Sequence, residues 1–333
     1  MSAPIVHGGG ITAAAAAFGG RPEDWLDLST GINPCPPAVP VIDPRVWHRL
    51  PDRYLTERAQ AAAARYYGSG ETMPLSVSGT QSVIQLLPRL IAPASRVAIV
   101  SPTYGEYARA FTLAGCAVDA VSGLDAIGPE HALAVVVNPN NPDGRVHSRA
   151  GLLDLAARMA ARGGILVVDE AFGDGEATGS LAAQAGQTEG LIVFRSFGKF
   201  FGMAGVRLGF VIARPAVLSR FEEWLGPWAV SGPALAVATE LLSADPEPLR
   251  RVIGERKAGL LDVLSGAGLS VRGGASLFAL VEHEAAARLH EHLCRAHILV
   301  RKFDYDPRWL RFGLAPDAAG ERRLAGALSE FFR

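Results

Sequence analysis

The sequence predicts an α/β protein with a mainly parallel sheet, followed by a smaller α+β domain. Two observations carry this prediction. Between about residues 53 and 213, short apolar runs rich in β-branched residues alternate with helical stretches, and Gly, Pro, Asn or Asp bound the runs. After about residue 214 the pattern changes to longer helices, and then to strands that alternate with one helix. We therefore expect a large sheet covered on both faces, and a second unit after it.

Length and composition set the outline of the molecule. The chain has 333 residues, which suits an arm over residues 1–45, a large domain over 46–220 and a small domain over 221–333. The net charge of −1 gives no basic field for nucleic acid. Cys35, Cys116 and Cys294 lie far apart and lack metal-site spacing, so neither a disulfide framework nor a metal site is expected. The early apolar run 11–18 is too short to span a bilayer and lacks a basic leader, which favours the cytoplasm.

The first 45 residues are rich in glycine and proline. They contain His7-Gly8-Gly9-Gly10 and the segment Asp27 to Pro34, compositions that favour turns and short extended pieces. We expect an arm that crosses another surface of the protein. An ordered tail without a role is the alternative.

The large domain is expected to begin with a helix over 53–67. The sequence Gly79-Thr80-Gln81 then opens a second helix that we expect to continue through Leu90, and free amides at such a start can hold a phosphate. The predicted strands follow at 97–100, 118–121, 133–137, 165–168, 191–194 and 210–213.

The small domain is expected to combine helices and strands. Helices are predicted near 218–224, 233–242, 246–264, 284–296 and 318–332, and strands at 276–281, 298–303 and 309–314. Two of these strands carry an arginine beside apolar neighbours, Arg301 and Arg311. A guanidinium held on a strand suits a carboxylate or a phosphate, although a salt-bridged edge residue is the alternative for both.

Polar residues follow several of the predicted parallel strands at the point where each strand ends. Tyr104 follows strand 97–100, Asn141 follows 133–137, Asp169 follows 165–168, and Ser196 with Lys199 follows 191–194. The carboxyl ends of parallel strands share one edge of a sheet, where ligands bind. The sequence therefore predicts a site at this edge.

Lys199 is the centre of the predicted site. It is one of three lysines, against 29 arginines, and it stands between an apolar strand and a glycine-rich turn. Burial there would lower the pKa of the amine, as a Schiff-base lysine requires. Ser196, Arg207 and the nearby glycines suit an aldehyde cofactor that carries a phosphate, namely pyridoxal phosphate (PLP). A surface lysine in a flexible loop is the alternative.

The other strand-end residues fit the remaining parts of such a cofactor. Asp169 would face the ring nitrogen and keep it protonated, Asn141 would donate to the phenolate oxygen, and Tyr104 would stack on the ring. Taken singly, each residue has a simpler role: a strand-end cap, a turn former and a core aromatic, respectively.

Together these stretches resemble the fold-type I PLP enzymes of the aminotransferase superfamily. The motif Ser196-x-x-Lys199-x-x-Gly202-x-x-Gly205-x-Arg207-x-Gly209 carries the resemblance, with Asn-Pro-Asn-Asn-Pro and Asp-Glu-Ala upstream. Within this superfamily the segments around His7 and Asp27 to Pro34, Phe172 in Asp-Glu-Ala-Phe, and the pair Pro227-Trp228 are similar to threonine-phosphate decarboxylases of cobalamin biosynthesis.

The resemblance implies a reaction and a set of roles. Threonine-phosphate decarboxylases convert L-threonine O-3-phosphate to (R)-1-aminopropan-2-yl phosphate and carbon dioxide. By position, the catalytic residues would be Lys199, Asp169 and Asn141; the substrate site would comprise His7, Gly31, Arg301 and Arg311, with Arg311 on the carboxylate and Arg301 and His7 on the phosphate. The cofactor would be held by Gly79, Thr80, Gln81, Tyr104, Asn141, Asp169, Ser196, Lys199 and Arg207.

The resemblance also implies a homodimer and leaves alternatives. Many aminotransferases have a tyrosine where Phe172 stands, and Leu50 replaces a tyrosine that reaches the neighbouring subunit's cofactor phosphate, a contact that Tyr54 could supply. Histidinol-phosphate aminotransferase, which also acts on a phosphorylated amine, is the second functional hypothesis. A PLP-binding transcription regulator is disfavoured because the short arm has no room for a helix-turn-helix.

Overall fold

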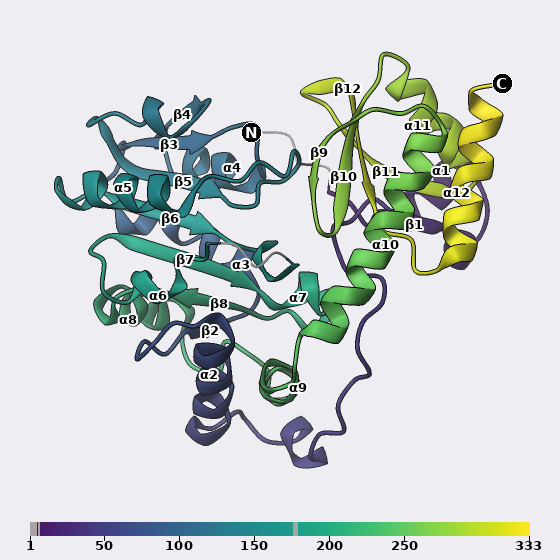
Figure 1. The fold of residues 1–333 in the computed structure, drawn as a ribbon. Helices are drawn as coiled ribbons and strands as arrows, with labels where there is room; N and C mark the ends of the chain where they lie inside the picture. Colours follow the sequence, from purple (N-terminus) through teal and green to yellow (C-terminus); the bar gives the residue numbers. More distant parts are fainter. Residues whose placement is uncertain (1–4, 6, 176–178) are drawn as a thin grey trace.

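The computed structural model describes residue 5 and residues 7–175 and 179–333, and it arranges them around two β-sheets (Figure 1). The seven-stranded sheet with its helices forms one side of the molecule, and the five-stranded sheet forms the other. The long helix α10 (Glu247–Gly266) runs along the side of the small sheet and leads into it from the large unit. The α/β fold class with a mostly parallel sheet and a smaller second unit is confirmed.

The large sheet has the strand order β2-β8-β7-β6-β5-β3-β4. Neighbouring strands from β7 through β4 are parallel, whereas β8 is antiparallel to both β7 and β2. Consequently β2 runs in the same direction as β7 and ends at the same edge. The strands are β2 (Leu75–Val77), β3 (Arg96–Val100), β4 (Ala117–Val121), β5 (His131–Val137), β6 (Ile165–Asp169), β7 (Leu191–Ser196) and β8 (Gly209–Ile212).

Alternating side chains of this sheet enter two apolar cores, one on each face. On one face Ile99, Val135 and Phe194 pack with helices α3 (Thr80–Ile84), α4 (Glu106–Leu113) and α8 (Pro215–Leu225). On the other face the neighbouring strand residues pack with α2 (Arg53–Tyr67), α5 (Arg149–Ala160), α6 (Ala182–Ala185) and α9 (Gly232–Ser243). Burial on both faces explains why these strands are apolar without alternation.

The small sheet has the order β1-β11-β12-β10-β9. Its strand β1 comes from the amino-terminal arm and pairs in parallel with β11, while the other pairs are antiparallel. The strands are β1 (Leu26–Leu28), β9 (Val271–Ala275), β10 (Phe278–Glu282), β11 (Ile298–Phe303) and β12 (Asp306–Gly313); the helices beside them are α1 (Ile11–Phe18), α10, α11 (Ala286–Arg295) and α12 (Ala318–Phe331). The arm thus contributes one strand and one helix to this unit.

The predicted division of the chain at residue 220 stays a prediction. Helices α8 and α9 both pack on the large sheet, and α9 packs closely against α2. The helix expected through Leu90 ends at Ile84, and a 3₁₀ segment follows at Leu87–Leu90, where Pro88 lacks the amide proton that a continued α-helix needs.

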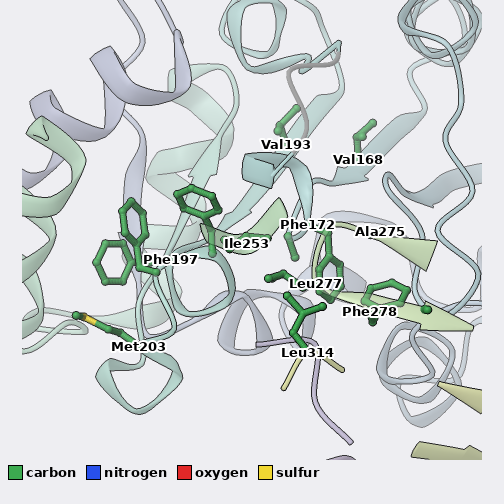
Figure 2. Close-up of a cluster of buried hydrophobic side chains, with 14 of the residues drawn as sticks. Val168, Phe172, Val193, Phe197, Met203, Ile253, Ala275, Leu277, Phe278 and Leu314 are labelled. Atoms are coloured by element: carbon green, nitrogen blue, oxygen red, sulfur yellow. The ribbon is translucent and has the colours of Figure 1, made fainter. Parts of the chain in front are cut away.

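The apolar core continues from one unit into the other (Figure 2). Phe172 of the large unit meets Phe278 of β10 edge to face, with ring centroids 5.1 Å apart. Val168 and Val193 from β6 and β7 belong to the same cluster as Leu277 and Leu314. The strand ends of the large sheet are therefore held against the small unit, and the site described below lies at this junction.

Candidate active site

The carboxyl ends of β2, β3, β5, β6 and β7 surround a cavity of about 160 Å³. All nine residues predicted to hold the cofactor line it, namely Gly79, Thr80, Gln81, Tyr104, Asn141, Asp169, Ser196, Lys199 and Arg207. Phe172, Gly198 and Leu208 are among the other lining residues. The structure brings these predicted residues together, and their individual roles stay predictions.

Lys199 lies on the short helix α7 (Phe197–Phe200), which begins as soon as β7 ends. Its ammonium nitrogen is 5.5 Å from the centre of the Phe172 ring. Burial is the main reason that the pKa of the amine falls to about 8; the positive charges of Arg311 and Arg207 act in the same direction, whereas Asp169 opposes them. A substantial share of this amine is therefore neutral, and able to attack a carbonyl, near neutral pH.

Asp169 is the last residue of β6, and only 4% of its surface is exposed. Its carboxylate accepts a hydrogen bond of 2.7 Å from the Tyr107 hydroxyl and one of 3.0 Å from the Ala171 amide. Burial raises the pKa of the carboxyl group, although the Tyr107 and Ala171 hydrogen bonds and Lys199 favour the charged form. A carboxylate in this setting gains from a cationic partner in the cavity, such as a protonated ring nitrogen.

The turn between β2 and α3 contributes Gly79, Thr80 and Gln81 to the wall of the cavity. Gly79 has a φ angle of +74°, and a Cβ atom there would lie 2.8 Å from a terminal nitrogen of Arg207. At Gly209 a Cβ atom would lie 3.0 Å from the amide nitrogen of Thr80. Because side chains would close this space, the glycines keep backbone amides and the Arg207 guanidinium open to a ligand. These donors fit a phosphate group.

Asn141 and Arg311 meet across the junction between the two units. The Nη1 of Arg311 donates to the Asn141 Oδ1, and its Nη2 donates 2.8 Å to the backbone oxygen of Ser29. A guanidinium has no acceptor, so the oxygen of the Asn141 amide must face it and the amide NH₂ is left to face elsewhere. That orientation is the one required to donate to a phenolate oxygen.

Arg311 is 6% exposed, and its buried Nε has no hydrogen-bond partner among the described residues. The pKa of Arg311 falls to about 10, chiefly because of burial and next because of the charge of Arg301. A buried cation with an unused donor is stabilised by an anion placed next to it. This observation fits the predicted carboxylate-binding role.

A second cavity of about 520 Å³ opens beside the first and shares Tyr104, Asn141 and Lys199 with it. It is lined by all four predicted substrate residues, which are His7, Gly31, Arg301 and Arg311, together with Tyr305 and Asp304. Gly31 is close-packed, since a Cβ atom there would lie 2.9 Å from the Phe172 ring. Three basic side chains therefore border an opening that leads to Lys199.

Sequence reasoning did not identify Tyr107 or Glu106. Tyr107 donates to Asp169, and Glu106 accepts a hydrogen bond of 2.9 Å from His7 and one of 3.0 Å from Gln81. Their nearness in sequence to Tyr104 was the one available signal. The Tyr104 hydroxyl donates 3.1 Å to Gln81, and burial raises the pKa of this hydroxyl to about 12.

The described part of the chain contains no cluster of three or more His, Cys, Asp or Glu side chains arranged to hold a metal ion. Within the same residues, no helix combines the length and apolar character that crossing a membrane requires.

Comparisons with known proteins agree with the fold. The sequence model of the family described as aminotransferase class I and II matches residues 23–328, and the chain belongs to this family. It is 63% identical to a threonine-phosphate decarboxylase of a Sinorhizobium species, over 99% of both chains. It is 42% identical to the threonine-phosphate decarboxylase of Pseudomonas aeruginosa, over 98% of both. The resemblance found in the sequence is thereby confirmed.

Among solved structures, the chain superimposes on the histidinol-phosphate aminotransferase of Sinorhizobium meliloti in complex with pyridoxal-5'-phosphate, with a TM-score of 0.85. The match covers 100% of this chain and 96% of the other, at 20% identity. This likeness concerns the fold.

Proposed function

We propose that the protein is a PLP-dependent decarboxylase that converts L-threonine O-3-phosphate to (R)-1-aminopropan-2-yl phosphate and carbon dioxide. The observation that carries the proposal is the placement of Lys199 between a cavity with phosphate donors and an opening lined by His7, Arg301 and Arg311. The full-length similarity to two threonine-phosphate decarboxylases supports it. Through this reaction the protein would serve cobalamin biosynthesis.

The first cavity fits PLP. Gly79, Thr80, Ser196 and Arg207 would hold its phosphate, Asp169 its ring nitrogen and Asn141 its phenolate oxygen, while Lys199 would carry it covalently. When bound, the cofactor supplies an electron-accepting ring that stabilises negative charge at the α-carbon of an amino acid.

The residues of the second cavity would bind and orient the substrate. The substrate carries two anionic groups, and the basic side chains there offer two anchors: Arg311 for the carboxylate, and Arg301 with His7 for the phosphate. Fixing both ends determines which bond at the α-carbon stands perpendicular to the cofactor ring, and this orientation selects carboxylate loss over proton loss. With its pKa about 8, the Lys199 amine can hold or release a proton beside that carbon near neutral pH.

Histidinol-phosphate aminotransferase remains the second candidate, because the fold is shared. The 63% identity to a decarboxylase favours the first. Phe172 is consistent with this preference, since it lies against the cavity and places a hydrocarbon edge where many aminotransferases carry a hydroxyl.

Product analysis separates the two candidates. The purified protein, loaded with PLP, is incubated with threonine phosphate in the absence of any oxo acid, and the products are followed by phosphorus NMR and carbon dioxide release. We expect one new phosphorus resonance and one equivalent of carbon dioxide. Turnover of histidinol phosphate that depends on 2-oxoglutarate, with no carbon dioxide from threonine phosphate, would overturn the proposal.

A homodimer is part of the proposal. Large apolar side chains are exposed along one stretch of the arm and the start of α2, and near the end of α8; they are Val39, Val41, Trp47, Leu50, Tyr54 and Trp228. Such a concentration is typical of an interface. Tyr54 is 67% exposed, so it is available to a neighbouring subunit in place of the tyrosine absent at Leu50. Sedimentation of a monomer alone, at assay concentrations, would contradict this part.

The remaining assignments stay predictions. We place the protein in the cytoplasm, which the three free cysteines Cys35, Cys116 and Cys294 favour. We expect no nucleic-acid partner, since the net charge of the chain is −1.

A further inference from the structure

Glu106 is a buried carboxylate at which several predicted site residues meet. It is the first residue of α4, and 7% of its surface is exposed. Its Oε1 accepts a hydrogen bond of 2.9 Å from the Nε2 of His7, and its Oε2 accepts one of 3.0 Å from the Nε2 of Gln81. Gln85 lies 3.4 Å from the same Oε2, and Arg109 lies 4.0 Å away. No role assigned so far uses this carboxylate.

The hydrogen bonds determine the orientation of the Gln81 amide. An ionised carboxylate only accepts, so the Gln81 NH₂ group must face Glu106 and the Gln81 Oε1 must face away from it. This Oε1 accepts the Tyr104 hydroxyl at 3.1 Å. Reversing the amide would place two oxygens against each other at Glu106. By orienting the Gln81 amide, the Glu106 carboxylate therefore directs the Gln81 Oε1 toward the Tyr104 hydroxyl and so helps to position the Tyr104 ring.

The same carboxylate determines the protonation pattern of His7. The Nε2 of His7 must carry a proton in order to donate to Glu106. His7 also lines the second cavity, so the carboxylate orients the imidazole at the place where the substrate phosphate would bind.

Glu106 also joins the two units of the molecule. His7 belongs to the arm, whose strand β1 is part of the small sheet, whereas α4 packs on the large sheet. Close packing accompanies this contact, since a Cβ atom at Gly105 would lie 3.1 Å from the Ile5 side chain. The His7 to Glu106 contact therefore holds the arm over the entrance to the second cavity.

We propose that Glu106 is a positioning residue that couples the substrate-phosphate anchor His7 to the cofactor-side pair Gln81 and Tyr104. The proposal rests on the proposed function for the identity of the substrate. It assigns Glu106 no contact with substrate or cofactor: the carboxylate acts through the three side chains that it orients.

The test compares Glu106→Ala, Glu106→Gln, His7→Ala and the double variant of His7→Ala with Glu106→Ala, all loaded with PLP. The matched control is Asp119→Asn, because Asp119 also accepts from a histidine, His131 at 3.1 Å, but lies on the outer strand β4. The measurements are the KM and kcat for threonine phosphate, the inhibition constant of L-threonine, and the circular dichroism of the bound cofactor.

Loss of a charge-assisted hydrogen bond corresponds to roughly a tenfold to hundredfold effect. We expect Glu106→Ala to raise the KM for threonine phosphate by about this factor, with a change of under about threefold in the inhibition constant of L-threonine. The double variant should be no worse than the poorer single variant, because both substitutions break one coupled contact. Glu106→Gln keeps the side-chain volume and one acceptor, so its KM for threonine phosphate should lie between those of Glu106→Ala and the wild type. This variant replaces Glu106→Ala in the test if Glu106→Ala does not fold.

The cofactor signal tests the other half of the coupling. Glu106→Ala should change the circular dichroism of the bound cofactor, through Gln81 and Tyr104, whereas Asp119→Asn should not. Losses that multiply in the double variant, equal losses for threonine phosphate and threonine, or the same losses in Asp119→Asn would each overturn the proposal.

Hydrogen exchange separates this proposal from the proposed function. In Glu106→Ala, the amide of Gly9, which donates 2.7 Å to the Ser29 hydroxyl, should exchange at least about tenfold faster, and this holds whichever substrate the enzyme uses. Unchanged exchange there overturns the positioning role. Failure of the wild type to release carbon dioxide from threonine phosphate, with exchange still accelerated, overturns the proposed function alone.

Discussion

Replacing Arg311 by methionine should raise the pKa of the Lys199 amine. This pKa lies at about 8 instead of 10.5; burial is the largest cause of the decrease, and the charge of Arg311 is the next. Methionine keeps the surroundings apolar, so the effect of burial remains while the repulsion between two cations is removed. The pKa of the variant should therefore lie between about 8 and 10.5.

The size of the effect follows from these two limits. At about pH 7.5, an amine with a pKa of 8 is neutral in roughly a quarter of the molecules, whereas an ordinary lysine is neutral in about one in a thousand. Only the neutral amine attacks an aldehyde. The rate of covalent PLP uptake by the cofactor-free protein should therefore fall in Arg311→Met, by up to about two hundredfold at this pH.

The assay is stopped-flow absorbance of PLP uptake by the cofactor-free protein, as a function of pH. Free Nα-acetyl-lysine measured in parallel corrects for the titration of PLP itself, and Arg295→Met, an exposed arginine of α11, serves as the remote control. The midpoint of the profile is the informative quantity, since it does not depend on the absolute affinity. A wild-type midpoint near 10, or no upward shift in Arg311→Met, would refute the argument.

Three further substitutions test separate parts of the site. Tyr107→Phe removes the hydroxyl that donates to Asp169, so cofactor affinity should fall by roughly tenfold in equilibrium dialysis, and unchanged affinity would argue against a supporting role. Gly79→Ala adds a Cβ atom 2.8 Å from the Arg207 guanidinium at a backbone φ of +74°, so it should weaken cofactor binding at least about tenfold. Gly266→Ala is the control, because a Cβ atom at Gly266 has no neighbouring atom within 4 Å. Arg301→Ala should raise the KM for threonine phosphate far more than the inhibition constant of threonine, and equal changes would remove its assignment to the phosphate.

The parts of the site that could be predicted are those that the sheet itself positions. Asp169 and Lys199 each follow an apolar strand directly, and parallel strands bring such residues to one edge whatever the loops do. The turn at Gly79 joins them for a less obvious reason. Strand β2 has three residues and was not predicted. Because β8 is antiparallel to both β7 and β2, β2 runs in the same direction as β7, and its carboxyl end lies at the same edge of the sheet.

The residues that could not be predicted depend on packing between elements distant in sequence. The contact between Glu106 and His7 spans 99 positions, and the contact between Tyr107 and Asp169 spans 62. Neither contact leaves a periodic or local signal, because both require helix α4 to lie against the sheet with a particular rotation. Helix α1 was missed for another reason: glycine and proline dominate its surroundings and favoured an extended arm.

A buried charge network behind the site explains how Asp169 and Lys199 are held in fixed relation. Arg195 donates 2.7 Å to Glu170 and 2.6 Å to Asp174, and all three residues are buried. Glu170 directly follows Asp169, so the ion pair with Arg195 fixes the end of β6 against β7, the strand that leads into Lys199. Breaking a buried pair on one side leaves an uncompensated charge, so substitution here should displace both strand ends together.

The two sets of residues in the site differ in the unit that carries them and therefore in what they control. The cofactor residues stand on strand ends that the apolar core and this charge network fix. Arg301, Arg311 and the arm that carries His7 belong to the small unit. They contact the large unit through hydrogen bonds such as the one from Arg311 to Asn141. Substitutions of the cofactor residues should consequently impair the binding of both cofactor and substrate, whereas substitutions confined to Arg301 or His7 should impair substrate binding alone. Parallel titrations of each variant with PLP and with threonine phosphate measure this difference.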